Sequence, residues 1–239
     1  MSSPEISLEI RWFFPGTVPA KEIRDWFLQN PRLGKRLTEK DGKKREDLYL
    51  LTPGNTGIGP KLREGKFEIK LLQGSQEITE PVSSASGQGE VWHKWKWPYA
   101  RGKKDKKIDE LITNSMLAGT RQKLRVLVSK KRWRRKFRVT GPGELAPATG
   151  SKKDLAWWVS AEFTELEVKG AAWWTLAVEI CENPEASMLL LKRCLSWMFQ
   201  DYAGPPLTAG NSYSYPAWLA VLVEKENPGK GRPCPSMRF

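Results

Sequence analysis

The stretch Glu5-Ile6-Ser7-Leu8-Glu9-Ile10-Arg11-Trp12 alternates polar and apolar side chains without a break. Successive side chains of an extended strand point to opposite faces, so the four polar residues share one face and the four apolar residues share the other. The stretch therefore predicts a β-strand over residues 5–14 with one charged face, ending at Pro15-Gly16.

Later parts of the chain repeat this pattern. A Gly-centred turn at 61–70 joins two runs whose polar residues can share one face. Those polar residues are Lys61, Arg63, Glu68 and Lys70. At 174–180 the same alternation places Glu179 opposite a row of apolar residues. A sheet with one solvated face explains any single case. Several such strands, in a chain that also carries amphipathic helices, favour helices covering the apolar faces and charged faces lining a shared cavity.

The composition indicates a folded protein with an anionic partner. Of its 239 residues, 39% are hydrophobic and 12 are Trp, enough for one sizeable core. Lys and Arg number 40 against 27 Asp and Glu, which gives a formal net charge of +13. This balance predicts an anionic partner, and phosphate-rich small molecules, nucleic acid and acidic membranes all satisfy it.

The cysteine, histidine and hydropathy patterns narrow the possible cellular compartments and the possible kinds of site. Cys181, Cys194 and Cys234 lack a metal-type spacing, and an odd number without a signal sequence favours a reducing cytosol. The single histidine, His93, argues against His-based nucleophilic catalysis and a His-ligated zinc site. No segment approaches the ~20 apolar residues of a membrane span. We therefore expect a cytoplasmic protein with no membrane partner.

The order of elements predicts an α+β protein with one mostly antiparallel sheet or barrel. Further strands are expected at 46–52, at 60–72 as a hairpin, and at 92–97, 157–168 and 172–180. Residues 124–139 predict one long strand or a hairpin with a break near Trp133. Helices are expected at 19–28, 108–117, 183–202 and 216–225, loops at 73–89 and 141–151, and a basic connection at 101–107. One domain is expected over 1–224, followed by a disordered tail over 225–239.

Short charged motifs follow one another in a fixed order between residues 5 and 200. They are Ser7-Leu8-Glu9-Ile10-Arg11, Glu46-Asp47-Leu48-Tyr49-Leu50, Lys61-Leu62-Arg63 with Glu68-Ile69-Lys70, the region Lys130-Lys131-Arg132, and the strands that carry Glu162 and Glu179. Their order resembles that of the CYTH superfamily, also called triphosphate tunnel metalloenzymes. The first three resemble its Glu-x-Glu-x-Lys signature, its Asp-x-Tyr strand and its Leu-Arg…Lys hairpin. The last two resemble its later basic and acidic strands.

The resemblance implies an eight-stranded antiparallel β tunnel with a polar interior and helices packed outside. It implies that inward-facing basic residues bind a triphosphate, polyphosphate or nucleotide: Arg11, Lys61, Arg63, Lys70, Lys130, Arg132 and Arg134. It also implies that Glu9, Glu162 and Glu179 hold Mg²⁺ or Mn²⁺, with Glu9 and Glu179 catalytic in hydrolysis of the terminal phosphate. Several charge-assisted bonds and a metal with hard oxygen ligands suit such a substrate.

The chain departs from the family pattern at three positions. Ser7 replaces the first signature glutamate, Arg11 replaces the lysine, and Ala177 stands where the family often has a carboxylate. Arg binds phosphate well, but Ser and Ala cannot replace metal-binding carboxylates. Three functions therefore stay open: a metal-dependent triphosphatase, a catalytically degenerate binding module, and a nucleic-acid-binding protein that uses the basic, Trp-containing stretches 92–97 and 130–138. Glu9 and Glu179 likewise have two interpretations, as metal ligands or as partners of nearby basic side chains.

Overall fold

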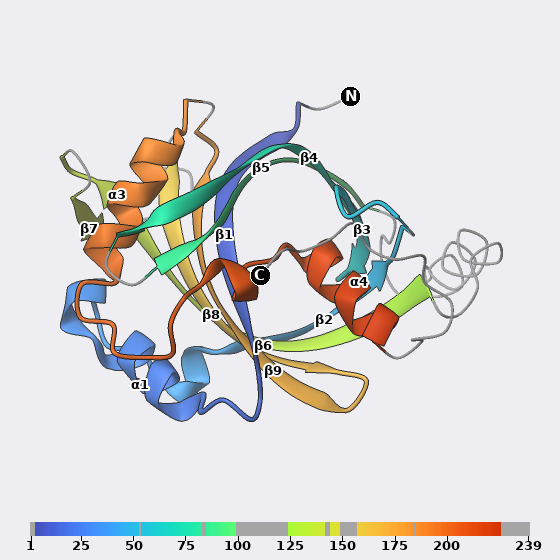
Figure 1. Ribbon diagram of the computed structural model, residues 1–239, viewed down its shortest axis with the longest axis horizontal. Helices are drawn as coiled ribbons and strands as arrows, with labels where there is room; N and C mark the ends of the chain where they lie inside the picture. Colours follow the sequence, from blue (N-terminus) through green and yellow to red (C-terminus); the bar gives the residue numbers. More distant parts are fainter. Residues whose placement is uncertain are drawn as a thin grey trace.

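Eight antiparallel strands form a closed barrel in the computed structural model of this chain (Figure 1). The structure describes residues 3–52, 54–82, 85–98, 124–141, 144–148, 157–183 and 185–225. The connection predicted at 101–107, the helix predicted at 108–117, and all but the first residue of the tail predicted over 225–239 lie outside the described residues.

The barrel strands pair in one continuous circuit. They are β1 (Glu5–Pro15), β2 (Lys43–Leu50), β3 (Ile58–Arg63), β4 (Lys66–Val82), β5 (Ala85–Pro98), β6 (Arg125–Val139), β8 (Trp158–Val168) and β9 (Ala171–Cys181). Their order is β2-β3-β4-β5-β1-β9-β8-β6, and β6 pairs back with β2 to close the barrel. A short strand, β7 (Leu145–Pro147), adds to the end of β6. The predicted α+β fold with an eight-stranded antiparallel barrel is confirmed.

Three helices pack against the barrel, and none in the described part of the chain is long and apolar enough to span a bilayer. They are α1 (Lys21–Gln29), α3 (Met188–Met198) and α4 (Tyr215–Lys225), and single 3-10 turns lie at Pro31–Leu33, Glu39–Asp41 and Ala209–Asn211. Helices α1 and α3 lie on one side of the barrel, whereas α4 lies on the other, next to β3 (Figure 1).

The strand alternation separates an apolar exterior from a polar interior. Leu8, Ile10 and Trp12 of β1 are at most 1% exposed and join a core with Phe27 of α1 and Leu195 of α3. The residues between them on β1 face the inside of the barrel. Burial of the outward apolar faces under α1 and α3 therefore fixes which residues turn inward, because side chains alternate along each strand.

Helix α4 covers one end of the barrel. At this end, inward-facing positions are apolar, including Phe13 on β1, Val128 on β6 and Leu166 on β8. These side chains pack with Trp218 and Leu219 of α4, and the rings of Phe13 and Trp218 stack with centroids 4.4 Å apart. The polar part of the interior is therefore bounded at this end by a helix with a small apolar core of its own.

The loop predicted over 73–89 is wrong, because both arms of this segment belong to strands. Strand β4 continues to Val82, and β5 pairs with it from Ala85 onward apart from two register shifts. Backbone hydrogen bonds form the ladder whatever the side chains, so a Ser-, Gly- and Gln-rich segment can still be a strand. Ile78 and Ala85 are fully buried in the main core and hold this hairpin in place.

Of the two alternatives predicted for residues 124–139, the single long strand is confirmed, because β6 runs unbroken through Trp133, which pairs with Phe163 of β8. Two other boundaries differ from the sequence prediction. The loop predicted over 141–151 contains β7. The helix expected from 183 to 202 is shorter and spans Met188–Met198. Ser187 caps its start by accepting a hydrogen bond from the Leu190 amide at 3.2 Å, whereas the residues before it form a separate turn.

Candidate functional site

The inward faces of the barrel enclose a polar cavity of about 190 Å³. Nine of the residues that line it are Lys or Arg and four are Glu. They are Arg11, Arg45, Lys61, Arg63, Lys70, Lys94, Lys96, Arg132 and Arg134, with Glu9, Glu68, Glu162 and Glu179. These residues come from all eight barrel strands. The structure thus brings together every site residue predicted from the sequence except Lys130, which lies beside the cavity with a fully buried amine.

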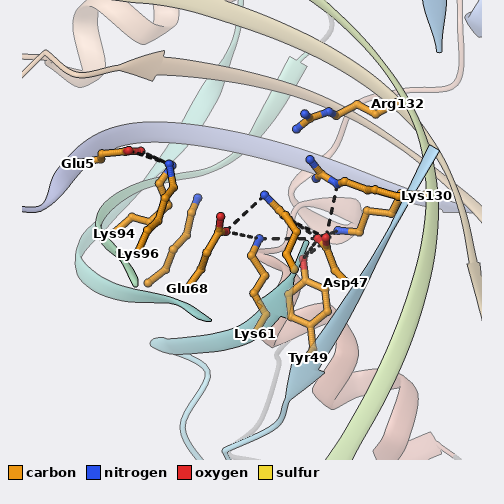
Figure 2. A network of polar contacts seen from close by, with 12 residues as sticks. Glu5, Asp47, Tyr49, Lys61, Glu68, Lys94, Lys96, Lys130 and Arg132 are labelled. Atoms are coloured by element: carbon orange, nitrogen blue, oxygen red, sulfur yellow. Dashed lines mark hydrogen bonds and ion pairs between the residues drawn. The ribbon is translucent and has the colours of Figure 1, made fainter. Parts of the chain in front are cut away.

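Asp47 of β2 is the centre of a buried basic cluster (Figure 2). Arg63 donates two hydrogen bonds to its carboxylate, of 2.6 and 2.7 Å. Lys130 Nζ, Arg45 Nε and Lys61 Nζ lie 3.0, 3.5 and 3.7 Å from the same carboxylate. Because the side chains of Asp47 and Lys130 are fully buried, one carboxylate faces four cationic side chains in a place with little access to water.

The cluster holds four basic side chains and two carboxylates. Glu68 of β4 adds a second carboxylate, 3.4 Å from Lys61 Nζ and 3.3 Å from Arg63 Nη1. Burial is the main reason that the pKa of Lys61 falls to about 7 and that the pKa of Lys130 falls well below its usual value. Burial alone would raise the pKa of Asp47, but the nearby cations hold it well below its usual range. An added anion would favour the charged forms of both lysines.

A second ion-pair group holds two arginines against the cavity. Glu162 of β8 accepts a hydrogen bond of 3.1 Å from Arg11 on one oxygen and another of 3.1 Å from Arg132 on the other. Thr164 also donates to Glu162, and Arg11 donates to Thr175. Burial alone would raise the pKa of Glu162, but the charges of Arg11 and Arg132 hold it well below its usual value. Glu162 therefore fixes the positions of both guanidinium groups.

Three carboxylates lie level with one another on neighbouring strands. Glu9 of β1 is the direct cross-strand neighbour of Glu179 on β9 and of Glu90 on β5. Lys70 donates to Glu9 at 2.7 Å, and Trp92 donates to Glu90 at 3.0 Å. Burial, followed by the charge of Glu9, raises the pKa of Glu90 to about 7. This side of the barrel gathers three carboxylates, whereas basic side chains predominate around Asp47.

The carboxylates fit a metal ion only in part. No group of three or more His, Cys, Asp or Glu residues within the described ranges is placed to hold one. Both oxygens of Glu162 accept hydrogen bonds from arginines, whereas Glu179 has no ion pair within 4.0 Å among the described residues. Glu9 accepts a hydrogen bond from Lys70 on one oxygen, so Glu9 and Glu179 keep more carboxylate oxygens without a basic partner than Glu162 does.

The barrel end opposite α4 carries a second hollow of about 250 Å³. It shares Lys94, Lys96, Arg134 and Glu179 with the main cavity. Lys96 and Lys94 contact the carboxylate of Glu5 at 2.7 and 2.9 Å (Figure 2). These shared residues connect the main cavity to this end of the barrel.

Several lining residues were not predicted as site residues. Lys94 and Lys96 share a strand face with Trp92, so the alternation at 92–97 contained the signal for them. Trp92 was assigned to packing, yet it lines the cavity while only 1% exposed. Arg45 lies two residues before Asp47, just ahead of the motif that begins at Glu46, and therefore on the same face as Asp47.

Two other residues of the barrel interior, Glu90 and Tyr215, carried little or no signal in the sequence. Glu90 follows directly on the segment mistaken for a loop, so it was never given a strand face. Tyr215 lines the cavity from the start of α4, and no strand periodicity marks a residue that arrives from a helix.

Comparisons with known proteins do not assign this site. No protein-family model matches the chain, and no curated protein matches it either. The function must therefore be argued from the cavity itself.

Proposed function

We propose that this protein binds a linear, phosphate-rich anion such as triphosphate, polyphosphate or a nucleotide inside its barrel, and hydrolyses the terminal phosphate with Mg²⁺ or Mn²⁺. The excess of basic over acidic side chains in the cavity lining, nine Lys or Arg against four Glu, carries this proposal. Such an excess of like charge in a partly buried cavity is unfavourable unless an anion compensates it. A chain of phosphates offers many anionic oxygens within one narrow cavity, which suits a wall of Lys and Arg donors.

The placement of charge supports a metal-assisted reaction. Around the barrel, β1 is four strands from β2 in either direction, so Glu9 and the Asp47 cluster lie on opposite walls. A phosphate chain between these walls would meet Arg45, Lys61 and Arg63 on one side and the carboxylates on the other. Glu9 and Glu179 would hold the metal there. When bound, the metal would polarise the terminal phosphate and lower the pKa of a water. Arg11 and Arg132, fixed by Glu162, would stabilise negative charge on the phosphate.

A thermal-shift screen tests the binding part of the proposal. The full chain would be heated with triphosphate, ATP, polyphosphate or a single-stranded oligonucleotide, each with and without Mg²⁺ or Mn²⁺. A ligand that binds the folded state raises the melting temperature whether or not it is turned over. We expect stabilisation by triphosphate, ATP and polyphosphate, whereas stabilisation by the oligonucleotide alone would refute the proposal.

A catalytically degenerate binding module is the second candidate. Lys70 already pairs with Glu9, Glu162 is occupied by two arginines, and Ser7 and Ala177 offer no carboxylate. Triphosphate binding without phosphate release at any Mg²⁺ or Mn²⁺ concentration would select this candidate.

A nucleic-acid-binding function finds less support in the arrangement of the basic stretch at 130–138. Trp133 is fully buried and donates a hydrogen bond to the carbonyl of Thr38, directly before the 3-10 turn Glu39–Asp41. Arg135 donates to backbone carbonyls of Phe27, Leu28 and Leu33. These side chains hold the fold together, so they do not offer an open surface for bases and phosphates.

A further inference from the structure

One end of the barrel interior is closed by α4. On four strands the inward positions at this end are apolar: Phe13, Val128, Leu166 and Val168, and Trp173. Trp218 and Leu219 of α4 fill the space between them. The polar cavity therefore has a closed end at α4, which we call the blind end. A ligand enters and leaves at the other end, through the hollow that Glu5, Lys96 and Lys136 line.

Tyr215, the first residue of α4, forms the floor of this blind end. Its ring stacks on Tyr49 with centroids 5.3 Å apart, and Lys130 Nζ lies 3.4 Å from its centroid. The guanidinium carbon of Arg11 lies 5.0 Å from the same centroid. The innermost surface of the cavity is thus an aromatic ring held between two cationic side chains.

The hydroxyl of Tyr215 is buried and has no hydrogen-bond partner among the described residues. A buried hydroxyl without a partner is unfavourable, so such a group is a natural place for a ligand atom. Burial also raises the pKa of Tyr215 to about 12, so the hydroxyl keeps its proton and can donate it to an anion.

We infer that the ligand enters terminal group first and that the Tyr215 hydroxyl donates a hydrogen bond to its terminal phosphoryl group. This inference rests on the proposed phosphate-binding function and narrows the ligand class to linear phosphates with at least one unesterified end. A free terminal phosphoryl group offers three acceptor oxygens to the Tyr215 hydroxyl and the Arg11 guanidinium. An esterified end would bring an organic group against Phe13, Tyr215 and Trp218, which already fill the space.

Isothermal titration with three compounds tests this entry direction. Triphosphate has two free ends, ATP has one, and diadenosine triphosphate has none. We expect triphosphate and ATP to bind and diadenosine triphosphate to bind at least roughly 10-fold more weakly, because it cannot offer the charge-assisted contacts of a free end. Equal affinity for ATP and diadenosine triphosphate would overturn the inference. Absence of binding by all three would instead refute the proposed function on which it rests.

The variant Tyr215→Phe tests the hydroxyl itself. It should weaken triphosphate binding by roughly 10-fold or more, the usual effect of losing a hydrogen bond to a charged group. The melting temperature of the free protein should not fall, because the hydroxyl has no partner to lose. Tyr213→Phe is the matched control, since Tyr213 does not line the cavity and should bind as the wild type does. Unchanged affinity in Tyr215→Phe would overturn the assignment of this residue.

Discussion

Asp47 shows how a single side chain can decide both stability and binding. Its carboxylate is within 3.7 Å of four cationic side chains and is fully buried. Asp47→Asn would leave these cations without their main partner, and removing one partner from a buried ion pair costs about 3–5 kcal/mol. We expect a loss of this size in the free energy of unfolding, measured by urea denaturation.

The neighbouring carboxylate provides the control for Asp47. Glu46 is exposed on the outer face of β2, so Glu46→Gln should change the free energy of unfolding by less than about 0.5 kcal/mol. Equal stability of Asp47→Asn and Glu46→Gln would show that the cluster does not depend on Asp47.

The lowered pKa of Lys61 predicts that ligand binding depends on pH. Its pKa of about 7 means that it loses its positive charge as the pH rises through neutrality. It is faced by Arg45, Asp47, Arg63, Glu68 and Lys130, of which the carboxylates favour its charged form and the cations oppose it. Affinity for ATP should therefore fall between pH 7 and pH 9, a range above the second pKa of a singly esterified phosphate, about 6.

The variant Lys61→Arg tests whether Lys61 is the cause of this pH dependence. Arginine stays charged over the whole range, so the fall in affinity should become shallower. The measurement is titration calorimetry at pH 7, 8 and 9 in buffers of equal ionic strength. A wild-type affinity that rises with pH would contradict the prediction.

At the scale of single residues, the sequence could be used through the alternation of side chains between the two faces of each strand. It placed Glu9, Arg11, Lys61, Arg63 and Lys70 on inward faces, where the structure has them. This alternation cannot show which cation pairs with which carboxylate, because the pairing depends on the order of the strands around the barrel. The Glu162 pairings with Arg11 and Arg132 join three strands and could not be read from spacing.

At the scale of elements, the sequence marked strands best where one face is apolar. The hairpin arms at 73–89 lack this alternation and were taken for a loop, although core contacts of Ile78 and Ala85 hold them. The start of α3 was misplaced because Asn183 and Ser187 are both good capping residues, and each accepts a hydrogen bond from a following amide. Only the turn after Ser187 continues as a helix. Local signals thus give element types more reliably than element ends.

Two adjacent arginines of β6 should have opposite effects because they point to opposite faces. Arg135 faces outward and donates to the Phe27, Leu28, Leu33 and Lys35 carbonyls, which lie in and after the last turn of α1. Arg135→Met would leave these carbonyls unpaired and should lower the free energy of unfolding by about 3 kcal/mol or more. Urea denaturation measures this loss.

Arg134 is the matched partner in this comparison. It lines the cavity and is exposed, so Arg134→Met should leave stability within about 0.5 kcal/mol of the wild type. It should instead weaken triphosphate binding, measured by titration. A stability loss in Arg134→Met equal to that in Arg135→Met would contradict the division of this strand into a structural face and a site face.

At the scale of the whole molecule, the barrel arranges its charges as two opposed walls and a blind end. The cation-rich wall lies around β2, β3 and β6, and the carboxylates of β5, β1 and β9 lie across the cavity from it. The sequence predicted the barrel and the polar interior, since both follow from strand alternation and antiparallel order. It did not predict the blind end, although the change from charged to apolar inward residues along β1, β6 and β8 already contained that signal.

The opposed walls lead to a last prediction, about activity. If the chain hydrolyses triphosphate, phosphate release should require added Mg²⁺ or Mn²⁺, because the metal would rest on only Glu9 and Glu179 and on ligands from phosphate and water. Glu179→Gln removes one of these two donors and should abolish release. It should leave triphosphate affinity within roughly 3-fold in the absence of metal, because the Asp47 cluster on the opposite wall is untouched. Glu167→Gln, on the exposed outer face of β8, is the control and should release phosphate as the wild type does. Full activity of Glu179→Gln, or hydrolysis in excess chelator, would show that the reaction does not use this wall of the barrel.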